Sequence, residues 1–204
     1  MIVRFFLLSV LAFAQDKPPL FYSWHAFEAV LFDNGKTELD AQFHFRTRDH
    51  FSVFQFARGS IYTSRRVGAK GTVGGGYFVQ RQEAAGRWTP QQRAWVYYSY
   101  RVDTGRWRHT PRVQADRIFG TPDPAYTRYR FAWQTEWRAK FSPYAGVEEF
   151  VENAGRQRTR PRAGVRFAAS STVDMDIGYI YDHIYLRSPG DRHILQTTFS
   201  FHKR

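Results

Sequence analysis

Two histidines stand near acidic side chains and have the residue types needed for acid–base chemistry. His44 shares the same alternate positions as Glu38 and Asp40, and His183 directly follows Asp182. A histidine that a carboxylate orients can accept a proton from water or from a serine hydroxyl. Neither histidine belongs to a G-x-S-x-G or H-E-x-x-H motif. We therefore keep His44 and His183 as catalytic candidates beside a structural, hydrogen-bonded role, and we predict neither a cofactor nor a metal site.

A much larger set of charged side chains recurs at every second position. Between Thr127 and Ala139 the charged residues share one parity, whereas Tyr129, Phe131 and Trp133 share the other. Successive side chains of a β-strand point to opposite faces, and a transmembrane barrel strand turns its aromatic face to lipid and its charged face to the lumen. The residues predicted to line the lumen are Arg93, Arg112, Asp116, Arg128, Arg130, Glu136, Arg138, Glu148, Glu152, Arg158, Arg160, Arg162, Arg166, Asp174 and Asp176.

The net charge of the inward face changes sign from one predicted strand to the next. It is basic in 127–139, acidic in 142–152, basic in 157–168 and acidic in 173–185. Opposite charges at facing positions attract, and pairing matters more in a narrow lumen, where a lone charge is costly. Two hypotheses stay open. Either salt bridges close the lumen and stiffen a structural barrel, or the excess of arginine makes a narrow pore that favours anions.

Strand-like segments and turn signals recur along most of the chain. Each segment is close to the roughly 9–11 residues with which a tilted strand crosses a bilayer. Tight turns alternate with longer connections, which puts the C-terminus on the periplasmic side. Because bacterial barrels have even strand numbers, we expect an all-β, antiparallel up-and-down transmembrane barrel of about ten strands, with 22–32 left outside it, or of twelve strands as the alternative. The candidate segments are 22–32, 38–47, 51–62, 69–81, 92–102, 107–119, 127–139, 142–152, 157–168, 173–185 and 192–201.

The glycines Gly68, Gly71, Gly74, Gly75 and Gly76 lie close together. A phosphate-binding loop would require a following helix and usually a Lys-Ser/Thr pair, but 77–79 has the character of a strand. The glycines therefore predict a bend, or a close approach to the backbone, in a curved barrel wall.

The composition agrees with an exported membrane barrel. The chain of 204 residues has a formal net charge of +12, 18% aromatic residues and no cysteine. Arg4, the apolar stretch 5–13 and an A-x-A site at 12–14 outline a cleaved signal peptide, so we assign 1–14 to the signal and 15–204 to an outer-membrane β-barrel domain. Export and the absence of a known binding motif argue against nucleic acid as the partner of the basic charge.

A series of short motifs runs in the same order as in a known family. They are QRAW at 92–95, RVQADR at 112–117, RYRF at 128–131, YAGVEEF at 144–150, RAGVRF at 162–167, IGY at 177–179 and HILQ at 193–196. Together they resemble the bacterial outer-membrane family known as the domain of unknown function numbered 2490, over about residues 22–201. The family pattern has Glu where this chain has Asp116. The resemblance implies an outer-membrane barrel and no particular activity.

These observations predict a monomeric Gram-negative outer-membrane protein with a structural or narrow-pore role. Its expected partners are outer-membrane lipids, lipopolysaccharide and the barrel-insertion machinery, which reads a terminal aromatic residue such as Phe201. The first alternative is a lipid-modifying outer-membrane enzyme of the hydrolase or acyltransferase type. The second is a soluble exported β-sandwich that binds a ligand. The arginines expected to meet lipopolysaccharide phosphates are Arg87, Arg117, Arg187 and Arg192.

Overall fold

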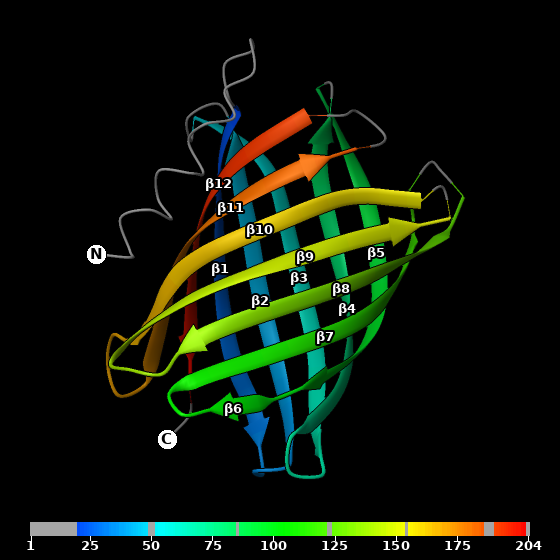
Figure 1. Cartoon of the computed structure of the whole chain (residues 1–204). Coiled ribbons are helices and arrows are strands. Elements are labelled where there is room, and N and C mark those ends of the chain that lie inside the picture. Colours follow the sequence, from blue (N-terminus) through cyan, green and yellow to red (C-terminus); the bar gives the residue numbers. More distant parts are fainter. Residues whose placement is uncertain are drawn as a thin grey trace.

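The strands of this chain pair edge to edge until the sheet closes on itself (Figure 1). The computed structural model describes residues 20–48, 52–84, 86–121, 124–153, 155–185 and 190–202, so the predicted signal peptide at 1–14 and Arg187 lie outside it. In the described part of the chain, no helix has the length and apolar character needed to cross a bilayer. The strands are β1 (Leu20–Asp33), β2 (Thr37–Arg48), β3 (Val53–Val67), β4 (Gly71–Ala84), β5 (Arg87–Tyr100), β6 (Val102–Thr104), β7 (Trp107–Phe119), β8 (Tyr126–Trp137), β9 (Phe141–Glu152), β10 (Gly155–Ala168), β11 (Val173–Ile184) and β12 (Gly190–Phe201).

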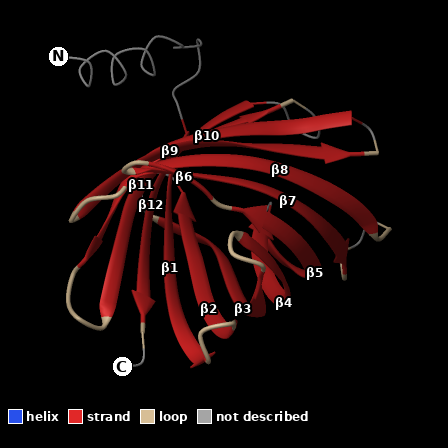
Figure 2. Cartoon of the chain, turned by 60° about the horizontal axis from the view of Figure 1, so that its bottom comes forward, coloured by secondary structure: helices blue, strands red, loops and turns tan. Residues whose placement is uncertain are grey.

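Neighbours in the chain pair antiparallel, as predicted for an up-and-down barrel. The sheet order runs from β5 to β1 and then from β12 to β7 and β6. The pairing of β5 with β7 closes the ring, and the short β6 pairs with β7 in the same register, beyond a break at Arg101. Because β6 thus continues β5, eleven strands make the barrel wall, which Figure 2 shows from its lower end.

The first strand is part of the barrel wall. β1 pairs antiparallel with β2 and parallel with β12, from Leu20 opposite Arg192 to Ala29 opposite Phe201. The all-β barrel is confirmed, but segment 22–32, which the even-number rule left outside, is a barrel strand, and the expected ten strands become eleven. In an up-and-down chain, an odd number of strands makes the first and last run in the same direction, so they must pair parallel.

The connections divide between the two ends of the barrel. Those after β2, β4, β7, β9 and β11 lie at one end, which we call the loop end, together with the start of β1. Those after β1, β3, β6, β8 and β10 lie at the opposite end, the turn end, together with the end of β12. The loop end is at the top of Figure 1.

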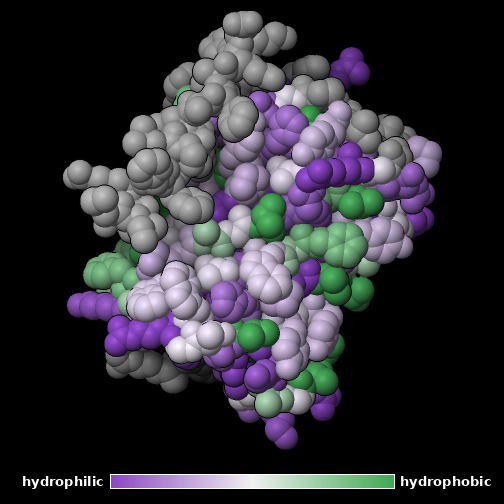
Figure 3. All heavy atoms as spheres, viewed as in Figure 1, coloured by the Kyte–Doolittle hydropathy of each residue, from purple (hydrophilic) through white to green (hydrophobic). Residues whose placement is uncertain are grey.

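The outward face of the wall is apolar and aromatic, as the alternation predicts. Val113 on β7 is 49% exposed, and Phe131 and Trp133 on β8 are 51% and 49% exposed. Val96 on β5 is 63% exposed. Figure 3 looks at the wall over β7 to β10 and shows pale and green side chains across its middle. A strand period of two therefore carries the sequence pattern directly onto the two faces of the wall.

Glycines of β4 let two aromatic rings lie on the inner surface of the wall. A Cβ atom on Gly74 would come within 2.5 Å of the Tyr97 ring, and one on Gly76 within 2.6 Å of the Trp95 ring. Both rings belong to β5, which pairs with β4 at these positions. The close approach predicted for the glycine stretch is confirmed here.

Candidate functional site

Three carboxylates lie inside the barrel and organise its charges. Asp116 on β7, Glu148 on β9 and Asp182 on β11 occupy inward positions of every second strand. The side chains of Asp116 and Asp182 are fully buried, and that of Glu148 is 12% exposed. A buried carboxylate is costly unless cations and hydrogen bonds satisfy it. The groups around these three residues therefore decide the character of the lumen.

Asp116 is held by two arginines and an amide. Arg128, opposite it on β8, places Nε and Nη2 at 3.2 and 2.8 Å from Oδ2. Nη1 of Arg93 on β5 lies 3.4 Å from the same oxygen, and Nε2 of Gln114 donates to Oδ1 at 2.6 Å. Both carboxylate oxygens thus have donors, and the group ties β5, β7 and β8 together.

Glu148 collects arginines from both sides of its strand. Its Oε1 accepts from Nε of Arg130 on β8 at 3.0 Å, and also from Nη2 of that residue. Nη2 of Arg112 on β7 donates to the same oxygen at 3.3 Å, and Nη1 of Arg160 on β10 lies 3.8 Å from Oε2. One carboxylate therefore links four consecutive strands, β7 to β10.

Asp182 completes the set with two arginines of β10. Nε and Nη2 of Arg160 lie 3.2 and 3.0 Å from its two oxygens, and Nη1 of Arg158 lies 3.3 Å from Oδ2. Arg160 thus bridges Asp182 and Glu148. Because six arginines lie within salt-bridge distance of three carboxylates, this cluster keeps a surplus of positive charge. The six are Arg93, Arg112, Arg128, Arg130, Arg158 and Arg160.

A second network lies nearer the turn end. Arg166 on β10 reaches Glu136 on β8 at 3.2 Å and Asp176 on β11 at 3.1 Å. Asp176 also accepts a hydrogen bond of 2.7 Å from the Tyr144 hydroxyl on β9. Strands that do not pair directly, such as β8 and β10, are therefore cross-linked through the interior.

Aromatic rings fill the space between these charges. The guanidinium of Arg46 lies 3.7 Å from the centroid of the Trp24 ring and 4.2 Å from that of Phe56. Phe150 is 2% exposed and has four guanidinium groups 4.7 to 5.5 Å from its centroid. Cation–π contacts of this kind contribute about 0.5–2 kcal/mol each and leave the charge in place. The four arginines around Phe150 are Arg128, Arg130, Arg158 and Arg160.

The catalytic candidate His44 faces the lumen and belongs to this packing. Its Nδ1 accepts a hydrogen bond of 2.7 Å from Nη2 of Arg58, because arginine only donates. Its ring meets those of Trp24 and Phe56 edge-on. Nη2 of Arg58 also donates to Gln42 at 2.8 Å. The arrangement suits a structural histidine that orients an arginine.

A small cavity lies inside the barrel towards the loop end. Its volume is about 10 Å³, close to the space of a single water molecule. The buried Nε of Arg46, in its wall, has no hydrogen-bond partner among the described residues. Side chains therefore leave only a narrow space beside this guanidinium. The lining residues are Tyr22, Trp24, Arg46, Gln55, Phe56, Gln82, Arg192 and Ile194.

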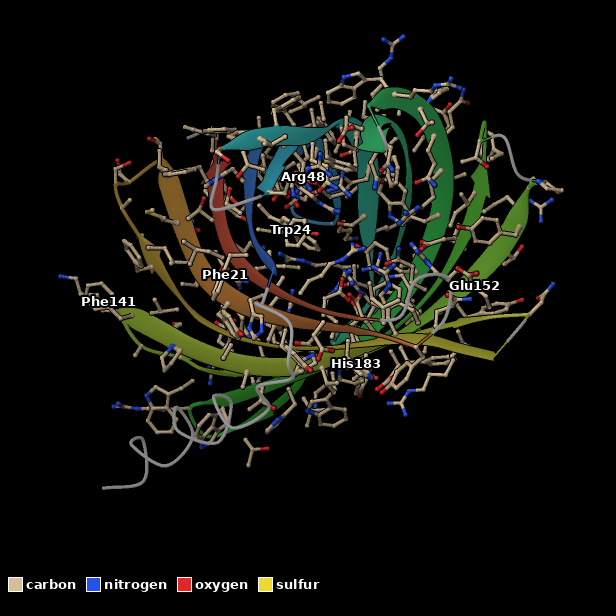
Figure 4. The ribbon with its side chains drawn as sticks, turned by 90° about the horizontal axis from the view of Figure 1, so that it is seen from above. Phe21, Trp24, Arg48, Phe141, Glu152 and His183 are labelled. Atoms are coloured by element: carbon tan, nitrogen blue, oxygen red, sulfur yellow. The ribbon has the colours of Figure 1, made fainter. Side chains whose placement is uncertain are left out.

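The second catalytic candidate, His183, lies on the outer side of the wall. Figure 4 shows Trp24 within the ring of strands and His183 beside the outer wall. Adjacent residues of a strand point to opposite faces, so His183 does not pair with the inward Asp182. Its Nδ1 lies 2.5 Å from Oδ1 of Asp191, which stands opposite it on β12. The acidic partner of His183 thus comes from the neighbouring strand.

Two predicted lumen residues lie at the turn end. Arg138 follows the end of β8, is 44% exposed, lies 3.9 Å from Asp103 and donates to the backbone carbonyl of Gly105 at 2.6 Å. Asp174, near the start of β11, is 44% exposed, and its Oδ2 lies 3.1 Å from Nε2 of His202. Both side chains are partly exposed to solvent, because they lie where strands end and turns begin.

The remaining predicted residues lie inside the wall. Arg162 donates to the side chain of Gln134, two strands away, and its guanidinium is 5.6 Å from the centroid of the Tyr144 ring. Glu152 is 9% exposed and stands opposite Arg128 at the end of β9. The structure therefore brings most of the predicted set into one connected interior.

Sequence reasoning missed the aromatic residues of the lumen and one arginine beside them, Arg58. Trp24 was not predicted to line the lumen, because the ten-strand prediction left segment 22–32 outside the barrel. In β3, the register shifts where Thr47 pairs with Phe54 and Arg46 pairs with Phe56. Phe54 is consequently 48% exposed and Phe56 only 2%, although both have even numbers. A bulge of this kind leaves little signal in the sequence.

Comparison with known proteins identifies a family for this chain but gives no activity. Among the described residues, no group of three or more histidine, aspartate or glutamate side chains could hold a metal ion. Residues 23–193 match the family described as protein of unknown function (DUF2490). No curated protein and no solved structure matches the chain.

Proposed function

We propose, from the premise that this chain belongs to the DUF2490 family, that it is an outer-membrane β-barrel with a narrow, arginine-lined lumen that favours anions. The leader at 1–14 would direct its export in a Gram-negative cell, and the barrel-insertion machinery would place it in the membrane as a monomer. The observation that carries the proposal is the excess of arginine over carboxylate around Asp116, Glu148 and Asp182.

The placement of polar and apolar groups supports a membrane location. Phe43, Val96 and Phe131 expose 50%, 63% and 51% of their surfaces on the outer wall, whereas Asp116 and Asp182 are fully buried inside. A soluble barrel gains stability from the reverse arrangement, because apolar surface exposed to water is costly. Hydrocarbon around the wall would remove that cost, and it tolerates strands only when their sheet closes.

The charge of the loop-end half supports a preference for anions. Six arginines share three carboxylates there, and Arg46 and Arg58 lie beside aromatic rings and polar groups. Rings of basic side chains attract anions and repel cations. The cavity of about 10 Å³ beside Arg46 leaves room for about one water molecule, so side chains fill this part of the interior, as expected for a narrow lumen and not for a wide aqueous channel.

The two halves of the lumen differ in sign. Glu28, Glu38 and Asp40 on β1 and β2 lie within electrostatic range of one another in the turn-end half. The arginine cluster lies nearer the loop end. A passage that is basic at one end and acidic at the other offers ions a different barrier from each side, so we expect its current to depend on the polarity of the voltage.

Ion selectivity in planar bilayers tests the proposal. Under a KCl gradient, the purified chain is expected to give small current steps. Their reversal potential should be shifted from zero towards the equilibrium potential of chloride. The double variant Arg46→Gln, Arg58→Gln should move the reversal potential towards zero, because it removes two lumenal charges without leaving a carboxylate unpaired. The matched control Arg81→Gln, Arg117→Gln removes two exposed arginines of odd, outward positions at the loop end and should keep the wild-type value.

Three results would contradict this function. Cation selectivity would show that the arginines do not determine the electrostatic potential in the lumen. If a protein shown to be inserted and folded gave no ionic current, the barrel would be closed and its role would be structural. A chain that stays monomeric and soluble without detergent would overturn the membrane location itself.

A lipid-modifying enzyme is the second candidate, and the 2.5 Å contact between His183 and Asp191 favours it. On the outer wall, such a pair could take a proton from water at a lipid ester. Turnover of a labelled phospholipid by the wild type, reduced about 10²–10⁴-fold in His183→Ala, would support it. His109→Ala is the control, because His109 is also outward and, among the described residues, its side chain hydrogen-bonds to a threonine, Thr135 at 3.0 Å, and not to a carboxylate. No turnover by the wild type would remove this candidate.

A further inference from the structure

The outer wall of β9 to β12 carries a continuous group of polar side chains near the loop end. We call this group the outer polar band. It contrasts with the apolar outward residues of β5 and β7, such as Val96 and Val113, which are 63% and 49% exposed. Its members are Glu149, Arg156, Thr159, Tyr179, Tyr181, His183, Tyr185, Asp191 and His193.

One half of the band is built around Asp191. Its Oδ1 lies 2.5 Å from Nδ1 of His183, and the Tyr181 hydroxyl hydrogen-bonds to the same carboxylate. The hydroxyl of Tyr179 hydrogen-bonds to His193 on β12. The Nδ1 contact of His183 leaves Nε2 at the far side of its ring, on a side chain that is 36% exposed.

The other half is built around Glu149. Nε and Nη2 of Arg156 lie 2.7 and 2.6 Å from its two oxygens, a bidentate pair. The Thr159 hydroxyl donates to Glu149 at 2.9 Å and lies 2.9 Å from the Tyr185 hydroxyl. The Tyr185 ring lies 4.9 Å from the Arg156 guanidinium and packs edge-on against His183 at 4.5 Å, which joins the two halves.

Contact between the outer polar band and lipid acyl chains is energetically unfavourable. Polar groups that face hydrocarbon lose hydrogen bonds to water and cost several kcal/mol each when unsatisfied. The band satisfies some of its groups internally, but its hydroxyl, imidazole and guanidinium groups keep further donor and acceptor positions open. The surface therefore needs a polar neighbour at the height of the lipid headgroups.

The chemistry of the band points to hydroxyl-rich ligands. Glu149 and Asp191 present carboxylates beside one arginine, so an added phosphate would meet negative as well as positive charge. Sugar hydroxyls donate to carboxylates and accept from arginine and tyrosine, and the C–H faces of a sugar ring pack on aromatic rings. The Tyr181, His183 and Tyr185 rings supply such a platform.

We propose that the outer polar band binds the sugar headgroup of an outer-leaflet glycolipid, whose acyl chains lie along the apolar wall below it. This inference rests on the proposed membrane location, and it is independent of ion conduction through the lumen. The lipid would hold the loop end at the level of the headgroups on one side of the barrel.

Native mass spectrometry of the full chain in detergent tests this inference. The probes are a synthetic monoglucosyl diacylglycerol and a phosphatidylcholine with the same acyl chains. The wild type is expected to retain the glucosyl lipid in preference to the phosphatidylcholine. His183→Phe with Asp191→Leu should lower the affinity for the glucosyl lipid about tenfold, the loss expected when one or two charged hydrogen bonds disappear. Both partners are replaced together so that neither polar group is left without the other.

The control is an outward polar pair on the opposite side of the barrel. Tyr77 on β4 donates to Gln92 on β5 at 2.5 Å. Tyr77→Phe with Gln92→Leu should leave glucosyl-lipid binding unchanged, and thermal unfolding checks that both double variants stay folded. Equal binding of the two lipids by the wild type, or equal losses in both double variants, would overturn the inference.

The outcome also separates this inference from the proposed function. Insertion into bilayers without a preference for the glucosyl lipid would overturn the sugar site alone. Failure to insert would overturn the membrane location, whatever the lipid binding. If the band variant turned a dimer into a monomer and lipid preference were absent, the band would be an interface between copies and the sugar site would be wrong.

Discussion

Replacing Glu148 by alanine is expected to lower the free energy of unfolding by about 3–5 kcal/mol. Glu148 accepts from Arg130 and Arg112 and lies 3.8 Å from Arg160. Removing it leaves these arginines close together in a confined lumen with one carboxylate fewer. Arg160 keeps Asp182, but Arg130 and Arg112 have no other carboxylate within 4 Å among the described residues.

The adjacent residue provides a matched control for this prediction. Glu149 points outward, is 28% exposed and pairs with Arg156, which is 54% exposed. An exposed ion pair contributes about 0–1 kcal/mol, so Glu149→Ala should cost no more than that. Urea unfolding in lipid vesicles, followed by tryptophan fluorescence, measures both. Equal losses in the two variants would show that the lumenal network does not hold the barrel together.

Gly76→Ala is the second change with a large expected cost, about 1–3 kcal/mol. The new Cβ would lie 2.5 Å from Cβ of Tyr62, 2.6 Å from the carbonyl oxygen of Ile61 and 2.6 Å from Cζ2 of Trp95. Two of these atoms belong to or adjoin the backbone of β3 and cannot move without disturbing the sheet. The strain should therefore appear as a lower urea midpoint, with Trp95 forced from its place on the inner wall.

Gly59 on β3 is the control for Gly76. It also lies within a strand, but no heavy atom lies within 4 Å of a Cβ built on it. Gly59→Ala should be neutral or stabilise the barrel by up to about 1 kcal/mol, because glycine loses more backbone freedom on folding than alanine does. If both variants unfolded at the same urea concentration, the close packing of Trp95 on β4 would not contribute to stability.

The alternation of side chains along each strand was readable from the residues alone. In β8, Arg128 and Arg130 point inward and Phe131 and Trp133 point outward, as their parity predicts. This follows because the period of two belongs to the extended backbone itself and needs no information from other strands. The barrel class and the charged lumen could be predicted for the same reason.

Closure depends on relations that no single segment contains. No residue pattern within 22–32 indicates that Ala29 pairs with Phe201, which lies near the other end of the chain. The parallel pair of β1 and β12 forms because the ring must close after an odd number of strands. The even-number rule, drawn from other barrels, could not replace that geometric fact.

The partners of individual charges also depend on the packed barrel. The neighbour of His183 in the sequence is Asp182, but the strand sends the two side chains to opposite faces and the hairpin brings Asp191 to the histidine. Arg46 finds the rings of Trp24 and Phe56 because β1, β2 and β3 lie side by side and a bulge turns Phe56 inward. Local spacing specifies the face on which a side chain lies, and the pairing of distant strands specifies what it meets there.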